Sequence, residues 1–165
     1  MSDFKDLFGD WQPGDEHEQH IPREMPGKQR EVKVINVFRE TDGTSLSLNG
    51  GIFVLLKDNL GRQLRIYTEK TMAIAISLAL SNEIPDRPFT HDLLKNMVDR
   101  LGGSIDHVVI DDLMQSIFYA KIALIVKEDI IMVDARPTDA IVIALRYRCP
   151  IYVHDSVLDA AQSME

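Results

Sequence analysis

The stretch IIMVDARPTDAIVIALR, residues 130–146, joins an aliphatic strand-like run to a helix-like run through an Asp-Ala-Arg-Pro step. Pro137 favours the first position of a helix, because its fixed φ suits a helix and its missing N–H would have no partner there. Asp139, in the first turn of that helix, complements the helix dipole. The stretch therefore predicts a strand that passes directly into a helix beginning at Pro137.

Upstream, strand-like runs alternate with turn-forming residues. The runs are EVKVINVF (31–38), SLSL (45–48), GIFVLLKD (51–58) and QLRIYT (63–68), separated by TDGT, NGG and DNLG. Glycine and asparagine tolerate positive φ, so these separators favour tight turns and the four runs predict an antiparallel meander. KTMAIAISLALSN (70–82) then changes to a helical pattern that is apolar almost all round, which predicts a helix deep in the core.

The second half of the chain predicts two more helices and several strands. Thr90 is a suitable N-cap for the helix HDLLKNMVDRL (91–101), which Gly102 or Gly103 would end. The further strands are SIDHVVID (104–111), IFYAKIALIV (117–126), IIMVD (130–134) and PIYVH (150–154), and a last helix begins near Ser156 with Asp155 or Ser156 as its cap. Both faces of 117–126 are apolar, which places this strand centrally in the sheet or at a subunit interface.

Hairpins mixed with crossovers predict an α+β fold with a mixed, largely antiparallel sheet and about four helices. A chain of 165 residues that is 45% hydrophobic supplies one core, so we expect a single domain over residues 31–165. Residues 1–30 carry seven acids against four bases and predict a mostly disordered tail.

Within the tail, Phe4, Leu7, Phe8 and Trp11 follow the spacing of one helical face. The amphipathic element 4–11 would pack on its own domain or dock to a partner. His17 and His20 form an HxxH pair with no third metal ligand in view.

The composition predicts a soluble, cytoplasmic protein with no membrane partner. The apolar run MAIAISLAL (72–80) falls short of the roughly 18 to 20 residues that span a bilayer, and no signal-peptide pattern begins the chain. The single cysteine, Cys149, excludes an intramolecular disulfide and looks like buried filler. A net charge of -8 disfavours an extended nucleic-acid groove but permits a small site where a metal lies between carboxylates and phosphate.

Two segments share an Arg-Pro step followed by threonine and an acid, RPFTHD (87–92) and RPTD (136–139). The start of a helix accounts for Thr90, Pro137 and Asp139, but it does not account for either arginine or for an acid at the end of an aliphatic strand. In a structural interpretation, Arg87 and Arg136 bridge Asp134, Asp139 or Asp92 and tie two helix starts together.

In a functional interpretation, the same residues form a site for metal-assisted phosphodiester hydrolysis. Asp134 and Asp139 would bind a divalent cation such as Mg²⁺ or Mn²⁺, with no organic cofactor. His91 or Asp92 would activate water, and the two arginines would hold phosphate. His107 and His154 are interpreted as structural or surface histidines.

RPFTHDLL, DARPTDAIVIALR and PIYV, in this order and spacing, resemble the bifunctional nuclease domain family over about residues 31–162. The resemblance implies an α+β domain with a mixed sheet and nuclease activity on DNA and RNA. It also implies a homo-oligomer, and a dimer is the oligomer that we expect. The polar residues at the family's signature positions are Arg87, Thr90, His91, Asp92, Asp134, Arg136, Thr138 and Asp139. We assign His91, Asp92, Asp134 and Asp139 to catalysis and Arg87, Arg136, Thr90 and Thr138 to substrate binding.

One segment departs from the family pattern. Thr68-Glu69 replaces a usual Ile-Gly, and Met72-Ala73 replaces a usual Glu-Ala, so Glu69 would have to act in place of the missing glutamate from the helix start. The leading hypothesis is a nuclease-like domain acting on DNA or RNA. The alternative is a non-catalytic oligomeric module that binds an anionic small ligand or a protein, which the net charge and Met72 favour.

Overall fold

The computed structural model describes residues 28–40 and 51–163. Four sequence predictions therefore fall outside the described residues: the disorder of the tail up to residue 27, the tail element 4–11, the pair His17 and His20, and the strand 45–48. The described chain forms a single seven-stranded sheet and four helices, so the predicted α+β fold is confirmed. None of these four helices is long and apolar enough to cross a membrane.

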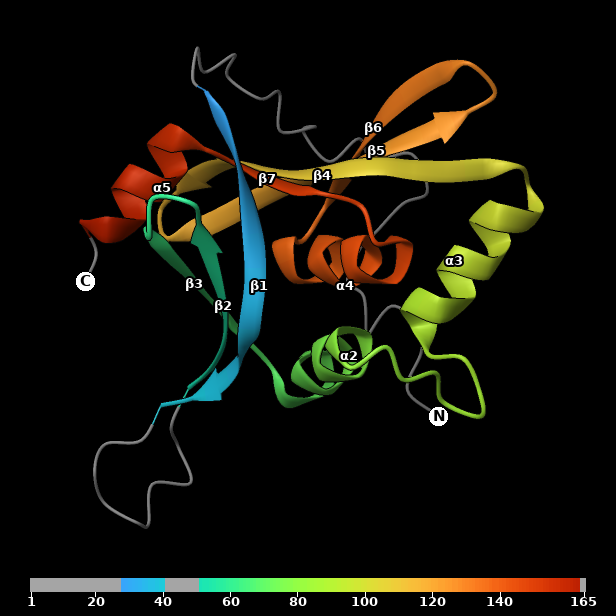
Figure 1. Cartoon of the computed structure of the whole chain (residues 1–165), viewed down its shortest axis with the longest axis horizontal. Coiled ribbons are helices and arrows are strands. Elements are labelled where there is room, and N and C mark those ends of the chain that lie inside the picture. Colours follow the sequence, from blue (N-terminus) through green and yellow to red (C-terminus); the bar gives the residue numbers. More distant parts are fainter. Residues whose placement is uncertain (1–27, 41–50, 164–165) are drawn as a thin grey trace, which may run out of the picture.

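The sheet order is β3-β2-β1-β7-β4-β5-β6, and only the β4–β7 pair is parallel. The strands are β1 (Gln29–Arg39), β2 (Ile52–Asp58), β3 (Gln63–Thr68), β4 (Gly103–Met114), β5 (Ile117–Val126), β6 (Asp129–Ala135) and β7 (Ile151–His154). The helices are α2 (Lys70–Leu80), α3 (Thr90–Arg100), α4 (Pro137–Tyr147) and α5 (Asp155–Gln162). In Figure 1, β1 and β4 run in very different directions, so the sheet is strongly twisted.

Helix α4 is the centre of the core. It begins at Pro137 as predicted and ends at Tyr147, and its C-cap residue Arg148 has a φ of 56°, in the left-handed region. Ala140, Ile141, Val142, Ile143 and Ala144 are buried, and α4 packs against α2, α3, β4 and β5. Figure 1 shows α4 between the strands β4 and β7 on one side and α2 on the other.

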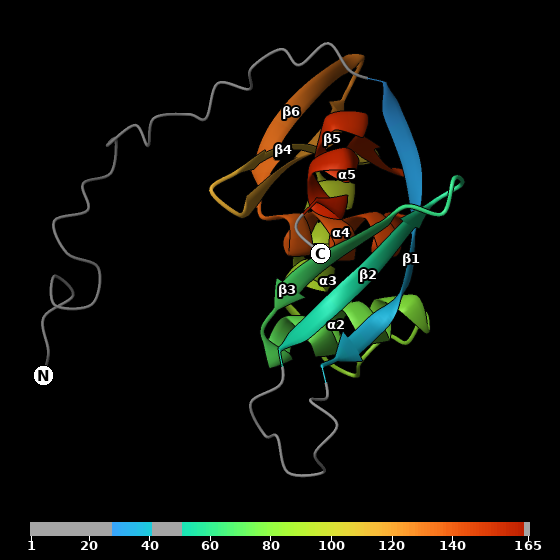
Figure 2. The ribbon, with the colours of Figure 1, turned by 90° about the vertical axis from the view of Figure 1, so that its left-hand side faces the viewer.

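Three of the four runs of the predicted antiparallel meander form β1, β2 and β3, and the fourth, 45–48, lies outside the described residues. Val54, Leu56, Leu64 and Ile66 alternate along β2 and β3 and are buried on one face, which is the period of a half-buried strand. In Figure 2 these three strands lie side by side in front of α2 and α4. The end of β3 passes directly into α2, which brings Thr68 and Glu69 close to the start of α4.

Three predicted helix boundaries need correction. Helix α2 ends at Leu80 instead of residue 82, and Ile74 is exposed, so α2 is not enclosed on all sides. Thr90 is the first residue of α3 and Phe89 is the N-cap, whereas Gly102, with φ of +77°, ends the helix as predicted. Helix α5 begins at Asp155 with His154 as its N-cap.

Strand β5 lies between β4 and β6, and β6 forms one edge of the sheet. The β4–β5 hairpin turns through Gln115 and Ser116, both with positive φ, and projects Phe118 and Tyr119 from the start of β5. The start of β5, the end of β3 and the start of α4 surround the candidate site.

Candidate functional site

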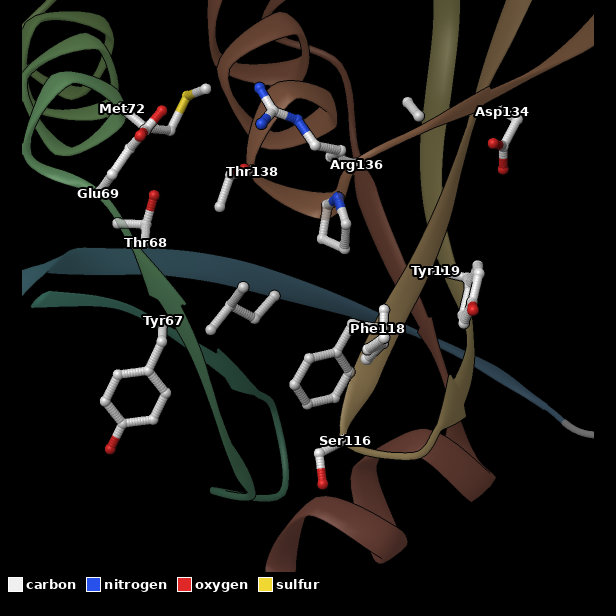
Figure 3. Close-up of a pocket in the computed structure, with 14 residues that line it drawn as sticks. Tyr67, Thr68, Glu69, Met72, Ser116, Phe118, Tyr119, Asp134, Arg136 and Thr138 are labelled. Carbon is white, nitrogen blue, oxygen red and sulfur yellow. The ribbon is translucent and has the colours of Figure 1, made fainter. Parts of the chain in front are cut away.

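Two adjacent cavities flank the start of α4. One, of about 540 Å³, is lined by Tyr67, Phe118 and Tyr119 together with residues of the β3–α2 and β6–α4 junctions, and we name it the aromatic cavity (Figure 3). The other, of about 460 Å³, is lined by His91, Asp139 and the starts of α2 and α3, and we name it the histidine cavity. Glu69, Met72 and Arg136 line both, so the two cavities adjoin at these three residues.

The histidine cavity contains a hydrogen-bonded cluster of three side chains. His91 Nε2 lies 2.9 Å from Asp139 Oδ1. Arg136 donates from Nε to Asp139 Oδ2 over 2.6 Å and from Nη2 to Asp139 Oδ1 over 3.3 Å. The two Arg-Pro segments therefore meet in space, which sequence spacing alone left open.

The starts of α3 and α4 position this cluster. His91 is the second residue of α3, and Asp139 is the third residue of α4. Burial alone would raise the pKa of Asp139, but hydrogen bonds from Arg136 and His91 and the positive charge of Arg136 lower the pKa overall. The hydrogen bond to Asp139 in turn raises the pKa of Arg136. Asp139 is thus ionised at neutral pH and fixes the orientation of His91.

A second ion pair, which was not predicted, forms a staple between the start of α3 and the last turn of α4. Arg146 Nε lies 2.8 Å from Asp92 Oδ1, and the two side chains are only 8% and 13% exposed. Arg146 also donates from Nη1 to the carbonyl oxygen of Glu83 over 2.7 Å. Asp92 Oδ2 accepts a hydrogen bond from the backbone N–H of Phe89 over 3.1 Å, which caps α3.

Arg87 and Asp134 do not take the places expected in the structural interpretation. Arg87 is exposed in the loop before α3 and, within the described residues, lines neither cavity. Asp134 is exposed near the end of β6 and lines the aromatic cavity, so its charge needs no buried partner. Its neighbour across the sheet is Lys121, which pairs with Asp111 at 2.9 Å. Arg136, in contrast, bonds Asp139, one of the three acids predicted for it, and His91 bonds the same carboxylate, so this cluster links the starts of α3 and α4.

The remaining predicted residues divide between the cavities. Thr90 lines the histidine cavity and Thr138 lines the aromatic cavity. Figure 3 shows the Arg136 guanidinium extending toward Glu69 and Met72, the positions at which the chain departs from the family pattern. Met72 is buried at the junction of the two cavities, so a thioether lies at the position where the resemblance led us to expect a glutamate.

The described carboxylates do not fit a preformed cation cage. Both oxygens of Asp139 already accept hydrogen bonds, and a positive guanidinium lies against them. Among the described residues, no group of three or more His, Cys, Asp or Glu side chains is arranged to hold a metal ion. The predicted ligands Asp134 and Asp139 would therefore need further oxygen ligands from elsewhere.

Sequence reasoning missed two features of the site. Arg146 was not predicted to belong to the site, because basic residues are common in the last turn of a helix, where they complement the helix dipole. Its seven-residue distance from Asp139, two helical turns, was the available signal that both lie on one face of α4. The aromatic residues of β3 and β5 were assigned only to strands, and nothing local in the sequence indicated that they share a cavity.

The other titratable candidates match their predicted structural roles. Burial raises the pKa of the Cys149 thiol to about 11, so it is protonated at neutral pH. His107 Nδ1 lies 2.7 Å from Asp106 Oδ2, and the ring contacts the edge of Tyr152 outside both cavities. This surface Asp–His pair is a useful counterpart to the pair formed by Asp139 and His91.

Comparison with known proteins identifies the family. The family model for the bifunctional nuclease domain matches residues 54–165. An uncharacterised protein of Mycobacterium tuberculosis (strain H37Rv) is 39% identical over 113 residues, which cover 68% of this chain and 67% of that protein. Bifunctional nuclease 1 of Oryza sativa subsp. indica is 30% identical over 106 residues, 62% of this chain and 32% of the relative.

Bifunctional nuclease 2 of Arabidopsis thaliana is 28% identical over 109 residues, 64% of this chain and 33% of the relative. The match thus spans about a third of each of these plant relatives. The family model covers both Arg-Pro segments, the central helix α4 and all residues of the His91–Asp139–Arg136 cluster. The chain belongs to the bifunctional nuclease domain family.

Proposed function

We propose that this protein hydrolyses phosphodiester bonds in DNA or RNA at the histidine cavity. The observation that carries the proposal is the hydrogen-bonded pair of His91 and Asp139 beside Arg136. We infer that His91 is the general base and that Arg136 binds phosphate, because a histidine oriented by a carboxylate suits the first role and a guanidinium suits the second. Family membership and plant relatives named bifunctional nucleases support the same activity.

In the proposed reaction, ionised Asp139 accepts a hydrogen bond from Nε2 of His91 and leaves Nδ1 as the unprotonated nitrogen. Nδ1 accepts a proton from water, whose oxygen forms a bond to phosphorus while the bond from phosphorus to one ester oxygen breaks. The departing alkoxide takes up the proton that the imidazolium then releases. Arg136 binds the non-bridging oxygens and stabilises the negative charge that grows on them.

The other predicted residues keep more distant roles in this proposal. Thr90 and Thr138 contact the substrate from the two cavities, and Arg87 contacts it outside them. Asp92 has a structural role, because one of its oxygens accepts a hydrogen bond from the backbone N–H of Phe89 and the other pairs with Arg146.

The divalent cation stays a prediction, and no step above passes through it. Mg²⁺ is commonly held by one or two carboxylates together with substrate phosphates and water. Asp134, which lines the aromatic cavity and is exposed, is the carboxylate to test as a ligand. A dependence on cation would appear as cleavage in Mg²⁺ or Mn²⁺ that stops in chelator and weakens in Asp134→Asn.

The proposal is tested by incubating highly purified protein with single-stranded DNA and with RNA, in Mg²⁺, in Mn²⁺ and in chelator. Asp139→Asn should lower the cleavage rate by about 100-fold, the usual contribution of a positioned general base. Asp106→Asn is the matched control, because Asp106 bonds a histidine outside both cavities, and it should keep the wild-type rate. Equal rates in wild type and Asp139→Asn would assign the activity to a contaminant or to another site.

A second candidate function is a non-catalytic module that binds an anionic small ligand or a protein. Met72 favours it, because a buried thioether at the junction of the two cavities supplies neither a proton acceptor nor a hard metal ligand. In that case Arg136 would bind an anion without turnover, and wild-type protein would bind oligonucleotide phosphate without cleaving it.

We also propose that the protein is a homodimer formed through β6. This edge strand exposes four consecutive apolar residues, Ile130, Ile131, Met132 and Val133, so apolar side chains point outward on both of its faces. An edge strand also presents unpaired N–H and C=O groups. An antiparallel β6 from a second copy satisfies both needs, since it pairs the main chain and brings apolar side chains to both faces.

A further inference from the structure

The aromatic side chains that line the aromatic cavity have no role in the proposed hydrolysis. Its volume, about 540 Å³, is within the usual range for a site that encloses a small ligand. Tyr67 comes from β3, whereas Phe118 and Tyr119 come from β5 on the opposite side. Figure 3 shows Phe118 on the side of β5 that faces the Tyr67 strand, with Arg136 above it in the view.

Charge confines a phosphate to one end of this cavity. Among the described residues that line the two cavities, Arg136 is the sole arginine or lysine, and its side chain is 69% exposed. Glu69 and Asp134 also line the aromatic cavity and repel a second phosphate. The net charge of -8 likewise offers no extended track for a polyanion. The rest of the cavity therefore suits the uncharged part of a nucleotide.

We propose that the aromatic cavity is a base-binding subsite, in which an unpaired base lies against the face of Phe118 while its phosphate lies at Arg136. The inference rests on the proposed nuclease function and names its substrate class, single-stranded or locally unpaired nucleic acid. Bases inside a duplex are stacked on their neighbours and paired, so they reach an aromatic side chain only when unpaired or flipped out. Every base has a π-face, so this subsite accepts DNA and RNA of many sequences.

The position of the subsite relative to the cluster supports this assignment. Arg136 lines both cavities and bonds Asp139 through Nε and Nη2, so a phosphate held by Nη1 lies between Phe118 and His91. A base in one cavity thereby places its own phosphodiester bond at the entrance of the other. Binding energy from the base would then orient the bond that reacts.

The test compares wild type with Phe118→Leu, which removes the π-face but keeps an apolar side chain of similar size. Phe38→Leu is the matched control, because Phe38 is an exposed aromatic residue of β1 that stacks on Phe53 and lines neither cavity. Binding of a fluorescently labelled single strand, of the blunt duplex of the same sequence and of an abasic oligonucleotide is measured by anisotropy. Cleavage of the same substrates is measured in parallel, and thermal melting checks that each variant is folded.

Wild type should bind the single strand about tenfold more tightly than the duplex or the abasic strand, and Phe118→Leu should lose that preference while Phe38→Leu keeps it. Equal binding of single strand and duplex by wild type, or unchanged single-strand binding by Phe118→Leu, would overturn the subsite. Cleavage judges the proposed function separately. If wild type prefers the single strand but does not cleave it, the base-binding subsite stands and the nuclease activity is overturned. If wild type cleaves nucleic acid but shows no preference for the single strand, the nuclease activity stands and the subsite is overturned.

Discussion

At the residue scale, the two acids that follow the threonines of the Arg-Pro segments have different tasks although they look equivalent in the sequence. Asp92 and Asp139 are each the third residue of a helix. Asp139 orients His91 at a cavity, whereas Asp92 caps its helix and pairs with buried Arg146. Helix-start chemistry predicted both positions, but only the packing of α3 on α4 decides which carboxylate reaches the histidine.

Asp92→Asn should destabilise the fold and affect activity only through it. Removing one charge of a largely buried pair leaves Arg146 without its partner, which costs about 3 kcal/mol. For a chain of this length that corresponds to a fall in Tm of about 10 °C. The double variant Asp92→Leu with Arg146→Met should recover part of the loss in calorimetry, because no unpaired charge remains. A Tm of Asp92→Asn equal to that of wild type would refute the staple.

The lowered pKa of Asp139 predicts a loss of stability in acid. Its pKa in the folded state is below the ordinary value of 3.8, so the ionised carboxylate stabilises the fold fully above about pH 4. That contribution is lost as the pH falls through the folded pKa, where Asp139 takes up a proton. Urea unfolding between pH 6 and pH 3 should therefore show a shallower acid loss for Asp139→Asn than for wild type. Parallel curves for the two proteins would contradict this assignment.

At the element scale, most strands and helices could be predicted because hydrophobic periodicity and turn residues are local. The meander β1 to β3, the strand β6 and the start of α4 at Pro137 were predicted close to their observed bounds. The exposure of Ile74 on α2 was not, because the pattern of an apolar helix does not say which of its faces a neighbour covers. The aromatic cavity was missed for the same reason, since it forms only where β3 and β5 approach the start of α4.

The β4–β5 turn stores backbone strain that can be relieved. Gln115 and Ser116 have φ of 49° and 65°, the conformation of a two-residue hairpin turn that normally takes Asn-Gly. Gln115→Asn combined with Ser116→Gly should therefore stabilise the protein by about 1 kcal/mol in chemical denaturation. Ser104→Gly is the matched control in β4, where glycine weakens a strand, and it should destabilise the protein. A loss of stability in the turn variant would contradict the account of strain.

At the scale of the whole molecule, the order of the strands is the property least visible in the sequence. Hairpins predicted that neighbours in sequence would pair, but the parallel pairing of β7 with β4 depends on the crossover through α4. This crossover makes β6 an edge and leaves its apolar residues exposed. The sequence pattern of 117–126 raised a subunit interface as one alternative, and the structure instead encloses that strand between β4 and β6.

The proposed dimer is tested by a pair of variants with nearly equal exposure. Ile131 on β6 is 48% exposed and Ile35 on β1 is 47% exposed. Replacing either isoleucine with lysine should therefore change the stability of the folded monomer by a similar amount. A lysine in the edge strand should block strand pairing. Light scattering coupled to size exclusion should show a dimer for wild type and Ile35→Lys and a monomer for Ile131→Lys. A wild-type monomer at micromolar concentration would contradict the proposal.

The most direct test of the central claim is a double-mutant cycle on the cleavage rate of single-stranded DNA and RNA. If His91 and Asp139 act as one catalytic unit, His91→Ala and Asp139→Asn should each slow cleavage by about 100-fold, and the double variant should be about as slow as either. The parallel cycle on the surface pair His107 and Asp106 should leave the rate unchanged. Wild-type cleavage by His91→Ala, or losses that multiply in the double variant, would contradict the account.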